Sequence, residues 1–461
     1  MLTQSGRRPM RERLLRQIYS SLWYVALPAL PLRLWWRGRL EHGYREHVGE
    51  RFGRYAAHVP AGPVVWLHAV SLGETNAARP LVMRIRQAFP GATILLTHMT
   101  ATGRAAGREI ADSRTLQAWL PYDVPRCVRA FLAHFRPTVG IVLETELWPN
   151  LLHACHARHV PVFLVNARLS ARSAARYARI PAIARPMFRG LAGVAAQTVE
   201  DAERISILGG AHVIATGNLK FDVEVPSGAR ELGVLLRRRF GTARAVVLLA
   251  SSREGEEVLV LEAWRKEAPP HAVLVIVPRH PQRFDGVARL LEASGLRYVR
   301  RSDDVDLPSD ARIVLGDSMG EMAAYLTAAD VVLMGGSYLP FGGQNLIEPI
   351  ALGKPTVVGP HMFNFAAVTQ GAVTAGATVE VADFNQAISV ATGLLADAQR
   401  CEAMTRAALA FHAAHRGATE RVWAWLSGRL EAAITGAPGA PQAGEAISRR
   451  VAGSHPRDRR P

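Results

Sequence analysis

Two carboxylates and a carboxamide follow a single apolar segment in the first half of the chain. Glu144, Glu146 and Asn150 come directly after residues 138–143, a short apolar run of the kind that forms a buried strand. Carboxylates at a strand end can exchange protons with a substrate or accept hydrogen bonds from the hydroxyls of a polyol. The pattern therefore predicts acid–base chemistry or polyol binding at the end of this strand.

Arginines recur at helical spacing soon after the next predicted strand. The series consists of Arg168, Arg172, Arg176 and Arg179. Residues three and four apart share one face of a helix, so this face is either a solvated surface or a patch for an anionic acceptor. Lys220, one of only three lysines in the chain, is expected near the border of two domains, where the residues of a cleft gather.

Three predicted strands lead into the pattern Ser-x-x-Glu, which caps the first turn of a helix. The three junctions are residues 71–74, 251–254 and 318–321. Each is either a plain helix cap or a place where the free N–H groups of a helix N-terminus bind an anion. Two of the three junctions lie in the second half of the chain, which is therefore predicted to bind the phosphate of a nucleotide.

Positive charge and glycine are concentrated after two other strands of the second half. Arg279, His280 and Arg283 follow a predicted strand at 272–277 and would add positive charge at the same edge of the sheet, either for a phosphate or as plain solvated surface charge. Glycines at 335–336 and 342–343 allow the backbone to approach a ligand closely, with a Gly-rich turn before an ordinary helix as the alternative.

Asn345 and Glu348 lie one helical turn apart just after these glycines. A carboxylate accepts hydrogen bonds from several donors, so Glu348 can bind the hydroxyls of a ribose. Together with the phosphate signals, this predicts a nucleoside site in the second half of the chain.

The histidines, cysteines and glycine motifs disfavour several other chemistries. His153, Cys155 and His156 point in diverging directions on a helix, and no second cluster completes a closed metal site. The chain has neither a Gly-Lys-Ser/Thr phosphate loop nor a clean Gly-x-Gly-x-x-Gly, which disfavours an ATPase and a dehydrogenase. The three cysteines form no Cys-x-x-Cys pair, which argues against a disulfide framework and is typical of a reducing compartment.

The elements that must position these residues are short β-rich segments alternating with helical patterns. Such alternation predicts parallel sheets built from βαβ units. The predicted strands are residues 64–70, 93–97, 138–143, 160–165 and 213–216 in a first set, and 245–250, 272–277, 313–315, 331–334 and 356–358 in a second. Two sets predict an α/β protein of two Rossmann-like domains facing a central cleft, with ligands at the carboxyl ends of the strands.

Domain borders follow from this division of the strands. We predict an N-terminal anchor at 1–48, a first Rossmann-like domain at 49–222, an interdomain linker region at 223–243, a second Rossmann-like domain with a closing helix at 244–432, and a disordered tail at 433–461. The closing helix is the Ala-rich segment around residues 402–430. The tail is assigned from its content of Gly, Pro, Ala and Arg.

The N-terminal segment combines arginines with an apolar stretch at residues 18–36. Five arginines precede the stretch, and within it lie aromatic residues that favour a membrane interface: Trp23, Tyr24, Trp35 and Trp36. Pro28, Pro31 and Arg33 interrupt it, which disfavours a spanning helix, and no small-residue cleavage site marks a signal peptide. We predict a basic amphipathic anchor that lies at an anionic membrane surface, with a helix packed on the first domain as the alternative.

The formal net charge of +16 suggests a nucleic-acid partner at first sight. However, ten of the sixteen excess positive charges lie in residues 1–54 and 436–461, and the middle of the chain is only mildly basic. The charge therefore predicts an anionic membrane surface as the partner and no nucleic acid. No later segment is long and apolar enough to span a bilayer, so the catalytic body is expected on the cytoplasmic side.

Many long motifs in a fixed order resemble the 3-deoxy-D-manno-octulosonic acid (Kdo) transferases of lipopolysaccharide synthesis. The motifs are residues 49–53, 70–75 (Val-Ser-Leu-Gly-Glu-Thr), 120–123, 144–150 (Glu-Thr-Glu-Leu-Trp-Pro-Asn), 166–170, 218–222, 277–284, 316–322, 342–349 and 359–365. The resemblance implies a GT-B glycosyltransferase with an N-terminal membrane-associated helix at the cytoplasmic face of the cell inner membrane. It also implies CMP-Kdo as donor, a lipid A precursor (lipid IVA) as acceptor, inversion at the anomeric carbon, and neither cofactor nor metal.

The resemblance also implies roles for individual residues. Glu74 would be the general base that takes the proton of the acceptor hydroxyl. Acceptor or Kdo binding would fall to Glu146, Arg168, Arg172 and Lys220, and CMP binding to Ser251, Arg279, His280, Ser318, Met319, Gly320, Asn345 and Glu348. Many relatives carry His at the position of Gln344, whose amide can still form hydrogen bonds.

Glu74 would also open a helix, and this position predicts a low pKa for its carboxyl group, which keeps it ionised but weakens it as a base. Two other hypotheses remain beside the Kdo transferase. One is a GT-B transferase or epimerase that uses a UDP-sugar. The other is a non-catalytic lipid-binding or membrane-scaffold protein, suggested by the basic amphipathic N-terminus.

Overall fold

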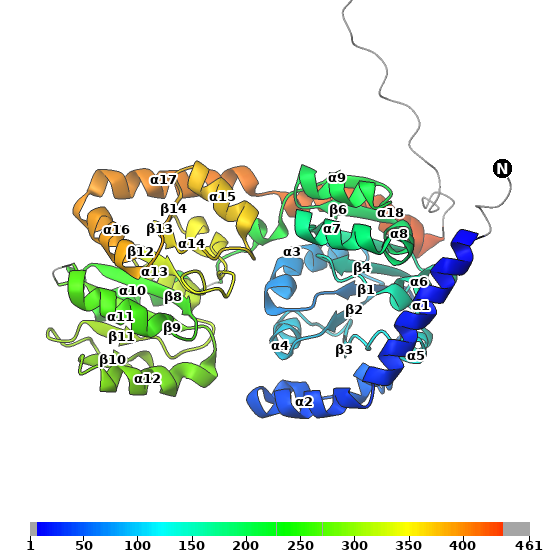
Figure 1. The fold of residues 1–461 in the computed structure, drawn as a ribbon, viewed down its shortest axis with the longest axis horizontal. Helices are drawn as coiled ribbons and strands as arrows, with labels where there is room; N and C mark the ends of the chain where they lie inside the picture. The colour runs from blue at the N-terminus through cyan, green and yellow to red at the C-terminus, as the bar shows by residue number, and fades with distance from the viewer. Residues whose placement is uncertain (1–6, 227, 270, 437–461) are drawn as a thin grey trace, which may run out of the picture. The chain divides into compact units, whose positions relative to one another are not determined.

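The chain divides into two compact units, each built around one parallel sheet (Figure 1). The computed structural model describes residues 7–436 except 227 and 270. Unit 1 extends to Val223 and takes up the chain again at Gly417, and unit 2 is Glu224–Arg416. Two Rossmann-like α/β domains are therefore confirmed, and each is described by itself below.

The sheet of unit 1 has the strand order β3-β2-β1-β4-β5-β6-β7, and all of its pairs are parallel. Its strands are β1 Val64–His68, β2 Thr93–His98, β3 Thr115–Trp119, β4 Val139–Leu143, β5 Val162–Ala167, β6 Gly193–Ala196 and β7 Val213–Ala215. Along β1, Val64 and Trp66 belong to one hydrophobic core, while Val65 and Leu67 belong to another on the opposite face. Because both faces are covered, the strands are continuous apolar runs rather than alternating ones.

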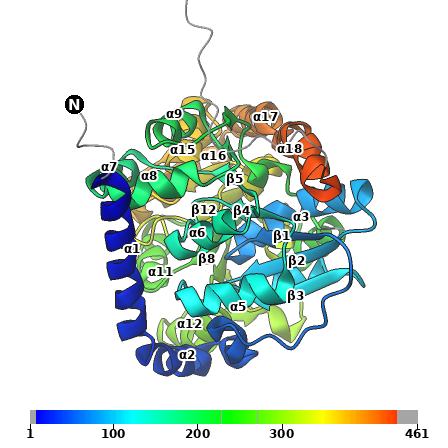
Figure 2. The same ribbon diagram turned by 90° about the vertical axis from the view of Figure 1, so that its right-hand side faces the viewer.

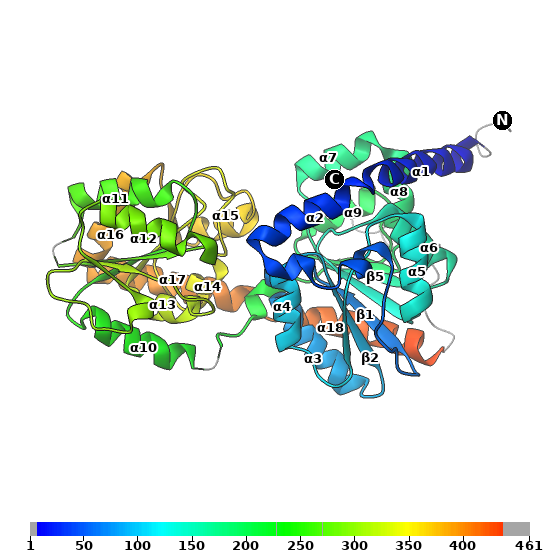
Figure 3. The same ribbon diagram turned by 90° about the horizontal axis from the view of Figure 1, so that it is seen from below.

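Helices pack on both faces of this sheet (Figure 3). They are α3 Leu72–Ala88, α4 Ala101–Glu109, α5 Pro125–Phe135, α6 Pro149–Ala157, α7 Ala171–Arg179, α8 Pro181–Arg189, α9 Val199–Ile207 and α18 Ala418–Thr435, with the short 3-10 helices η1 His42–Arg45, η2 Val48–Phe52 and η3 Leu219–Asp222. Helix α18 buries Val422, Leu426 and Leu430 in the core of unit 1. The prediction that residues 244–432 form one domain is therefore wrong for residues 417–432.

Unit 2 repeats the doubly wound arrangement with the strand order β10-β11-β9-β8-β12-β13-β14. Its strands are β8 Val246–Ser252, β9 Val273–Pro278, β10 Tyr298–Arg300, β11 Ile313–Leu315, β12 Val331–Met334, β13 Thr356–Val358 and β14 Thr378–Glu380. Its helices are α10 Ala229–Phe240, α11 Glu256–Glu267, α12 Phe284–Ala293, α13 Met322–Ala328, α14 Ile347–Ala351, α15 Ala366–Thr374, α16 Phe384–Ala396 and α17 Ala398–His415, with η4 Pro281–Arg283 and η5 Arg301–Asp303.

Three predicted segments differ in the structure. The linker region 223–243 contains helix α10, whose Leu236 and Phe240 are buried. The single closing helix is two helices, because the chain turns at Gly417, where φ is +83°, between α17 and α18. The predicted tail begins too early, because α18 continues to Thr435, and residues 437–461 lie outside the described part of the chain.

The N-terminal segment forms two helices, α1 Arg7–Ala26 and α2 Ala29–Leu40, that lie along unit 1 (Figure 2). One side of these helices packs against unit 1. Leu30 and Leu34 are buried in a hydrophobic cluster with residues of unit 1, and Trp23 packs against the same cluster. The alternative of a helix packed on the first domain is therefore confirmed for this side. Among the described helices, none combines the length and the apolar character that crossing a bilayer requires.

Candidate active site

Glu74 lies in the first turn of α3, just after the carboxyl end of β1. Ser71 caps this helix, as predicted, and its hydroxyl donates to Glu74 Oε1 at 2.9 Å. The Val70 N–H donates to Glu74 Oε2 at 2.8 Å, so both carboxylate oxygens are held. The side chain is only 7% exposed. The sheet order reverses between β1 and β4, and the carboxyl ends of the strands at such a reversal are where doubly wound domains bind their ligands.

The pKa of Glu74 is raised to about 7, which contradicts the expected low value. Burial is the largest cause, and the negative charge of Glu144 adds to it. The hydrogen bonds from Val70 and Ser71 lower the pKa but do not offset these two effects. The helix N-terminus alone was a poor guide because removal of the carboxylate from water penalises its charged form more strongly. A carboxyl group with a pKa near 7 is well suited to accept a proton at neutral pH.

Glu144 and Lys220 form an ion pair next to this carboxylate. Lys220 Nζ lies 2.7 Å from Glu144 Oε1, and both side chains are mostly buried. Glu144, which directly follows β4, has a left-handed backbone with φ of +57°. Such strain in a non-glycine residue is often found at functional sites. The structure thus brings Lys220 to the predicted site but pairs it with Glu144, a role that the sequence motif did not reveal.

A rigid turn presents Lys220 to this site. Asn166 Oδ1 accepts from the Leu219 N–H, and Asn218 Oδ1 accepts from the Lys220 N–H, both at 3.0 Å. At the end of the turn, the Asp222 carboxylate accepts from the backbone N–H groups of Gly417 and Thr419, which open α18. The lysine is therefore positioned by residues on β5 and α18 that are distant in sequence.

The structure brings only some of the other residues predicted to bind the acceptor substrate or Kdo close to Glu74. Burial and the charge of Glu144 raise the pKa of Glu146, which places Glu146 in the same group of carboxylates as Glu74. The carbonyl oxygen of Arg168 accepts a hydrogen bond from the Thr145 hydroxyl beside this group. Arg168 precedes α7, so the prediction that it shares a helical face with Arg172 is wrong, and Arg172 lies on the exposed surface of that helix.

In unit 2, the order of the sheet reverses between β8 and β12, and predicted CMP-binding residues lie at this point. Ser251, near the end of β8, has a left-handed φ of +58°. A Cβ atom at Gly335, just after β12, would lie 2.6 Å from the Ser251 carbonyl oxygen, so only glycine allows this close approach. The Arg279 N–H donates to the Ser252 carbonyl at 3.0 Å, which brings the end of β9 to the same place.

Arg279 is oriented by Gln344. Its Nε donates to Gln344 Oε1 at 3.1 Å, so the glutamine at this position works as a hydrogen-bond acceptor for the arginine. The adjacent His280 is half-buried, and burial followed by the charges of Arg279 and Arg253 lowers its pKa. A neutral imidazole beside two arginines can form hydrogen bonds with a phosphate or sugar without adding charge.

Glu256 organises this part of unit 2, and the sequence motifs did not single it out. The residue is fully buried, and its carboxylate accepts from the N–H groups of Arg253, Gly336 and Tyr338 at 2.8, 2.7 and 3.1 Å. Helix α11 begins at this residue, after Gly255, so the predicted cap at residues 251–254 is wrong. The Gly255-Glu256 pair was the available signal for the true start of the helix, since glycine is tolerated at an N-cap.

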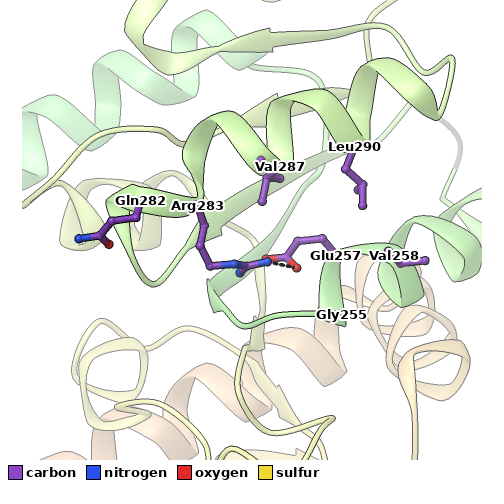
Figure 4. A pocket seen from close by; sticks show the side chains of 8 residues that line it. Gly255, Glu257, Val258, Gln282, Arg283, Val287 and Leu290 are labelled. Carbon is purple, nitrogen blue, oxygen red and sulfur yellow. Dashed lines mark hydrogen bonds and ion pairs between the residues drawn. The ribbon is translucent and has the colours of Figure 1, made fainter. Parts of the chain in front are cut away.

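Arg283 differs from Arg279 because it is paired with a buried carboxylate. Its guanidinium forms two hydrogen bonds with the buried Glu257 carboxylate, at 2.6 and 2.8 Å (Figure 4). The pair lines a pocket of about 240 Å³ between α11 and α12, together with Gly255, Gln282 and Leu290. The pairing neutralises the positive charge of Arg283, so this residue serves to hold the two helices together.

The segment after β11 carries three further predicted CMP-binding residues. Ser318 is bonded to Glu321 Oε2 and to the Tyr325 hydroxyl, both at 2.6 Å, while Met319 is 59% exposed. Gly320 has a φ of +77° and turns the chain toward α13. This helix begins only at Met322, so the cap predicted at 318–321 is also wrong.

Asn345 and Glu348 lie beside each other before and within α14. Asn345 Nδ2 donates to Glu348 Oε1 at 2.9 Å, and Asn345 Oδ1 accepts from the Ile347 N–H. This arrangement leaves the second carboxylate oxygen of Glu348 for another donor. The side chains predicted to bind CMP thus lie along one edge of the sheet of unit 2, at the carboxyl ends of β8, β9, β11 and β12.

Comparison with known proteins identifies the family. A family model described as 3-deoxy-D-manno-octulosonic-acid transferase (kdotransferase) matches residues 46–223. A 3-deoxy-D-manno-octulosonic acid transferase of Bordetella pertussis is 43% identical over 420 residues, covering 88% of this chain and 97% of that protein. One from Haemophilus influenzae is 33% identical over 423 residues, covering 90% and 99%.

A crystal structure of a putative UDP-N-acetylglucosamine 2-epimerase from Listeria monocytogenes aligns with a TM-score of 0.55. It covers 83% of this chain and 99% of its own at 15% identity, so it shows a common fold and nothing about substrates. This likeness confirms the predicted GT-B class. By its sequence relatives, the chain belongs to the family of 3-deoxy-D-manno-octulosonic acid transferases, which are glycosyltransferases.

Proposed function

We propose that this protein transfers Kdo from CMP-Kdo to a lipid A precursor, lipid IVA, in lipopolysaccharide biosynthesis. The observation that carries the proposal is Glu74, a buried carboxyl group with a pKa near 7 at the ligand-binding edge of the sheet of unit 1. Family membership supplies the transferred sugar, and the residues at the carboxyl edge of unit 2 support a nucleotide donor.

In this mechanism, Glu74 takes the proton from the acceptor hydroxyl as its oxygen attacks the anomeric carbon of Kdo. The bond between that carbon and the phosphate oxygen breaks, CMP leaves, and the configuration at the anomeric carbon is inverted. Lys220 binds the Kdo carboxylate or the acceptor, and Glu146 accepts hydrogen bonds from hydroxyl groups of the acceptor. Arg279 and the backbone N–H groups near it stabilise the negative charge that develops on the departing phosphate.

The direct test uses the purified full-length chain with CMP-Kdo and lipid IVA. We expect mass spectrometry to show the lipid product gaining Kdo, and calorimetry to show that CMP binds at least tenfold more tightly than UDP. A preference for UDP, or no transfer by a preparation that binds CMP, would contradict the proposal. The first outcome would favour a UDP-sugar enzyme instead.

We also propose that the outer side of α1 and α2 lies on the anionic cytoplasmic face of the inner membrane. Large apolar side chains are exposed there: Met10, Leu14, Ile18, Leu22, Val25, Leu32, Trp35 and Trp36. Val25 and Leu22 are 80% and 64% exposed. Arginines in α1 and α2 add an attraction to anionic lipids of about 1 kcal/mol each.

Flotation with lipid vesicles tests this surface. The variant Leu22→Ser/Val25→Ser is expected to bind anionic vesicles at least tenfold more weakly, since each buried aliphatic side chain contributes about 1.5–3 kcal/mol. Ile207→Ser, which removes a 77% exposed side chain from α9, is the matched control and should bind as the wild type does. Equal binding of all three proteins would refute a membrane role for this side.

A further inference from the structure

We propose that α1 is also a positioning element of the active site, because its packed side holds the loop of residues 144–148, which carries Glu144 and Glu146, and the start of α6 that follows it. This inference rests on the proposed function of that site. It assigns to the N-terminal helix a role in turnover that is separate from membrane attachment.

The first contact is an aromatic cluster around Trp23. The Trp23 ring centroid lies 6.2 Å from that of Trp148 in the loop and 5.9 Å from that of Tyr122, and Tyr19 packs edge-on against Trp23 at 6.5 Å. Aromatic pairs of this kind contribute about 0.5–1.5 kcal/mol beyond the area that they bury. Trp148 is the residue before the first turn of α6 and lies two positions after Glu146.

The second contact is a polar network at the start of α6. The Asp123 carboxylate accepts from the N–H groups of Asn150 and Leu151, at 2.9 and 2.8 Å, and Tyr19 lies close enough to lower the pKa of this carboxyl group. Asn150 Nδ2 donates to the Asp123 carbonyl at 2.7 Å, and Ser20 Oγ lies 3.0 Å from Asn150 Oδ1. Asp123 and Asn150 are 2% and 3% exposed, so water does not readily replace the groups supplied by α1.

The opposite end of the loop is held by the site itself. Lys220 binds Glu144, and the Thr145 hydroxyl donates to the Arg168 carbonyl. Glu146 therefore lies between one end fixed by the site and another fixed by α6 and α1. Because Glu144 also raises the pKa of Glu74, a displaced loop changes both the position of Glu146 and the basicity of the proposed base. Misplacement by about 1 Å can reduce turnover 100-fold.

Attachment and positioning differ in what they predict for kcat. A pure anchor only concentrates the enzyme at the membrane. The loss of activity in a variant without the anchor should therefore disappear when lipid IVA is dispersed in non-ionic detergent micelles at a saturating concentration. A positioning element keeps its effect under those conditions. We therefore expect Trp23→Ala to lower kcat at least tenfold in micelles, and the gentler Tyr19→Phe/Ser20→Ala to lower it about threefold to tenfold, with the KM for CMP-Kdo unchanged.

The control is Gln17→Ala/Ser21→Ala, which alters two exposed side chains on the same helix. It should retain the kcat of the wild type. Hydrogen exchange provides an independent readout, since the packed-side variants should lose protection in residues 144–150 while the control should not.

The proposal is overturned if both packed-side variants keep the wild-type kcat and protection, or if the control loses as much kcat as they do. A variant that fails to fold shows loss of protection throughout unit 1 rather than in the loop, and the Tyr19→Phe/Ser20→Ala variant then decides. If wild-type protein transfers no Kdo, the proposed function fails, whereas the exchange measurement still tests whether α1 orders the loop.

Discussion

Glu74→Gln is expected to lower kcat for Kdo transfer by about 10²–10⁴-fold, the usual contribution of a general base. Glutamine keeps the size and the hydrogen bonds to Val70 and Ser71 within reach, but it cannot accept the proton of the acceptor hydroxyl. In the proposed mechanism CMP is bound by unit 2, so calorimetry should show unchanged CMP affinity. The matched control is Glu109→Gln, an exposed carboxylate on α4 of the same unit, which should stay within twofold of wild-type kcat.

The pH dependence of kcat/KM gives a second, sharper test of the same residue. Since the base must be ionised and the pKa of Glu74 is about 7, kcat/KM should fall about tenfold per pH unit below 7. Removing the negative charge of Glu144 lowers the pKa of Glu74, so Glu144→Gln should move this limb to lower pH. If Glu74→Gln keeps wild-type turnover, or the limb does not move in Glu144→Gln, the assignment of the base is wrong.

Glu256→Ala is expected to lower the free energy of unfolding of unit 2 by about 3–5 kcal/mol, because it leaves three buried N–H groups without an acceptor. For a unit of this size, the melting temperature should fall by about 6–20 °C. The N–H groups belong to segments on both sides of the reversal between β8 and β12, so CMP affinity should fall at least tenfold. Scanning calorimetry with and without CMP measures both effects, since CMP should raise the transition of unit 2.

The control for this variant is Glu262→Ala, which removes an exposed carboxylate from the same helix. It is expected to change stability by less than about 0.5 kcal/mol, as surface substitutions usually do. Similar losses in both variants would show that the hydrogen bonds of Glu256 have no special role.

The pattern Ser-x-x-Glu predicts the start of a helix at only one of its three positions in this chain. Ser-x-x-Glu marked the start of α3 correctly, but the same pattern failed before α11 and α13. In both failures no side chain of the pattern caps the helix: Glu254 pairs with Arg253, and Ser318 bonds to the side chains of Glu321 and Tyr325. Four strands of the structure, β3, β6, β10 and β14, are missing from the predicted set. Of these, β3, β10 and β14 are edge strands, where partial exposure weakens the apolar signal.

Local spacing and composition were enough to predict two parallel α/β domains, because buried strands between helices need continuous apolar runs that are visible in one dimension. The motifs likewise marked Glu74, Lys220 and Arg279. The pKa of Glu74, the pairing of Lys220 with Glu144, the role of Glu256 and the return of α18 to unit 1 depend on burial and on contacts between residues as far as 195 positions apart. Charge and desolvation act through space, so their balance at this site required the three-dimensional arrangement of the chain.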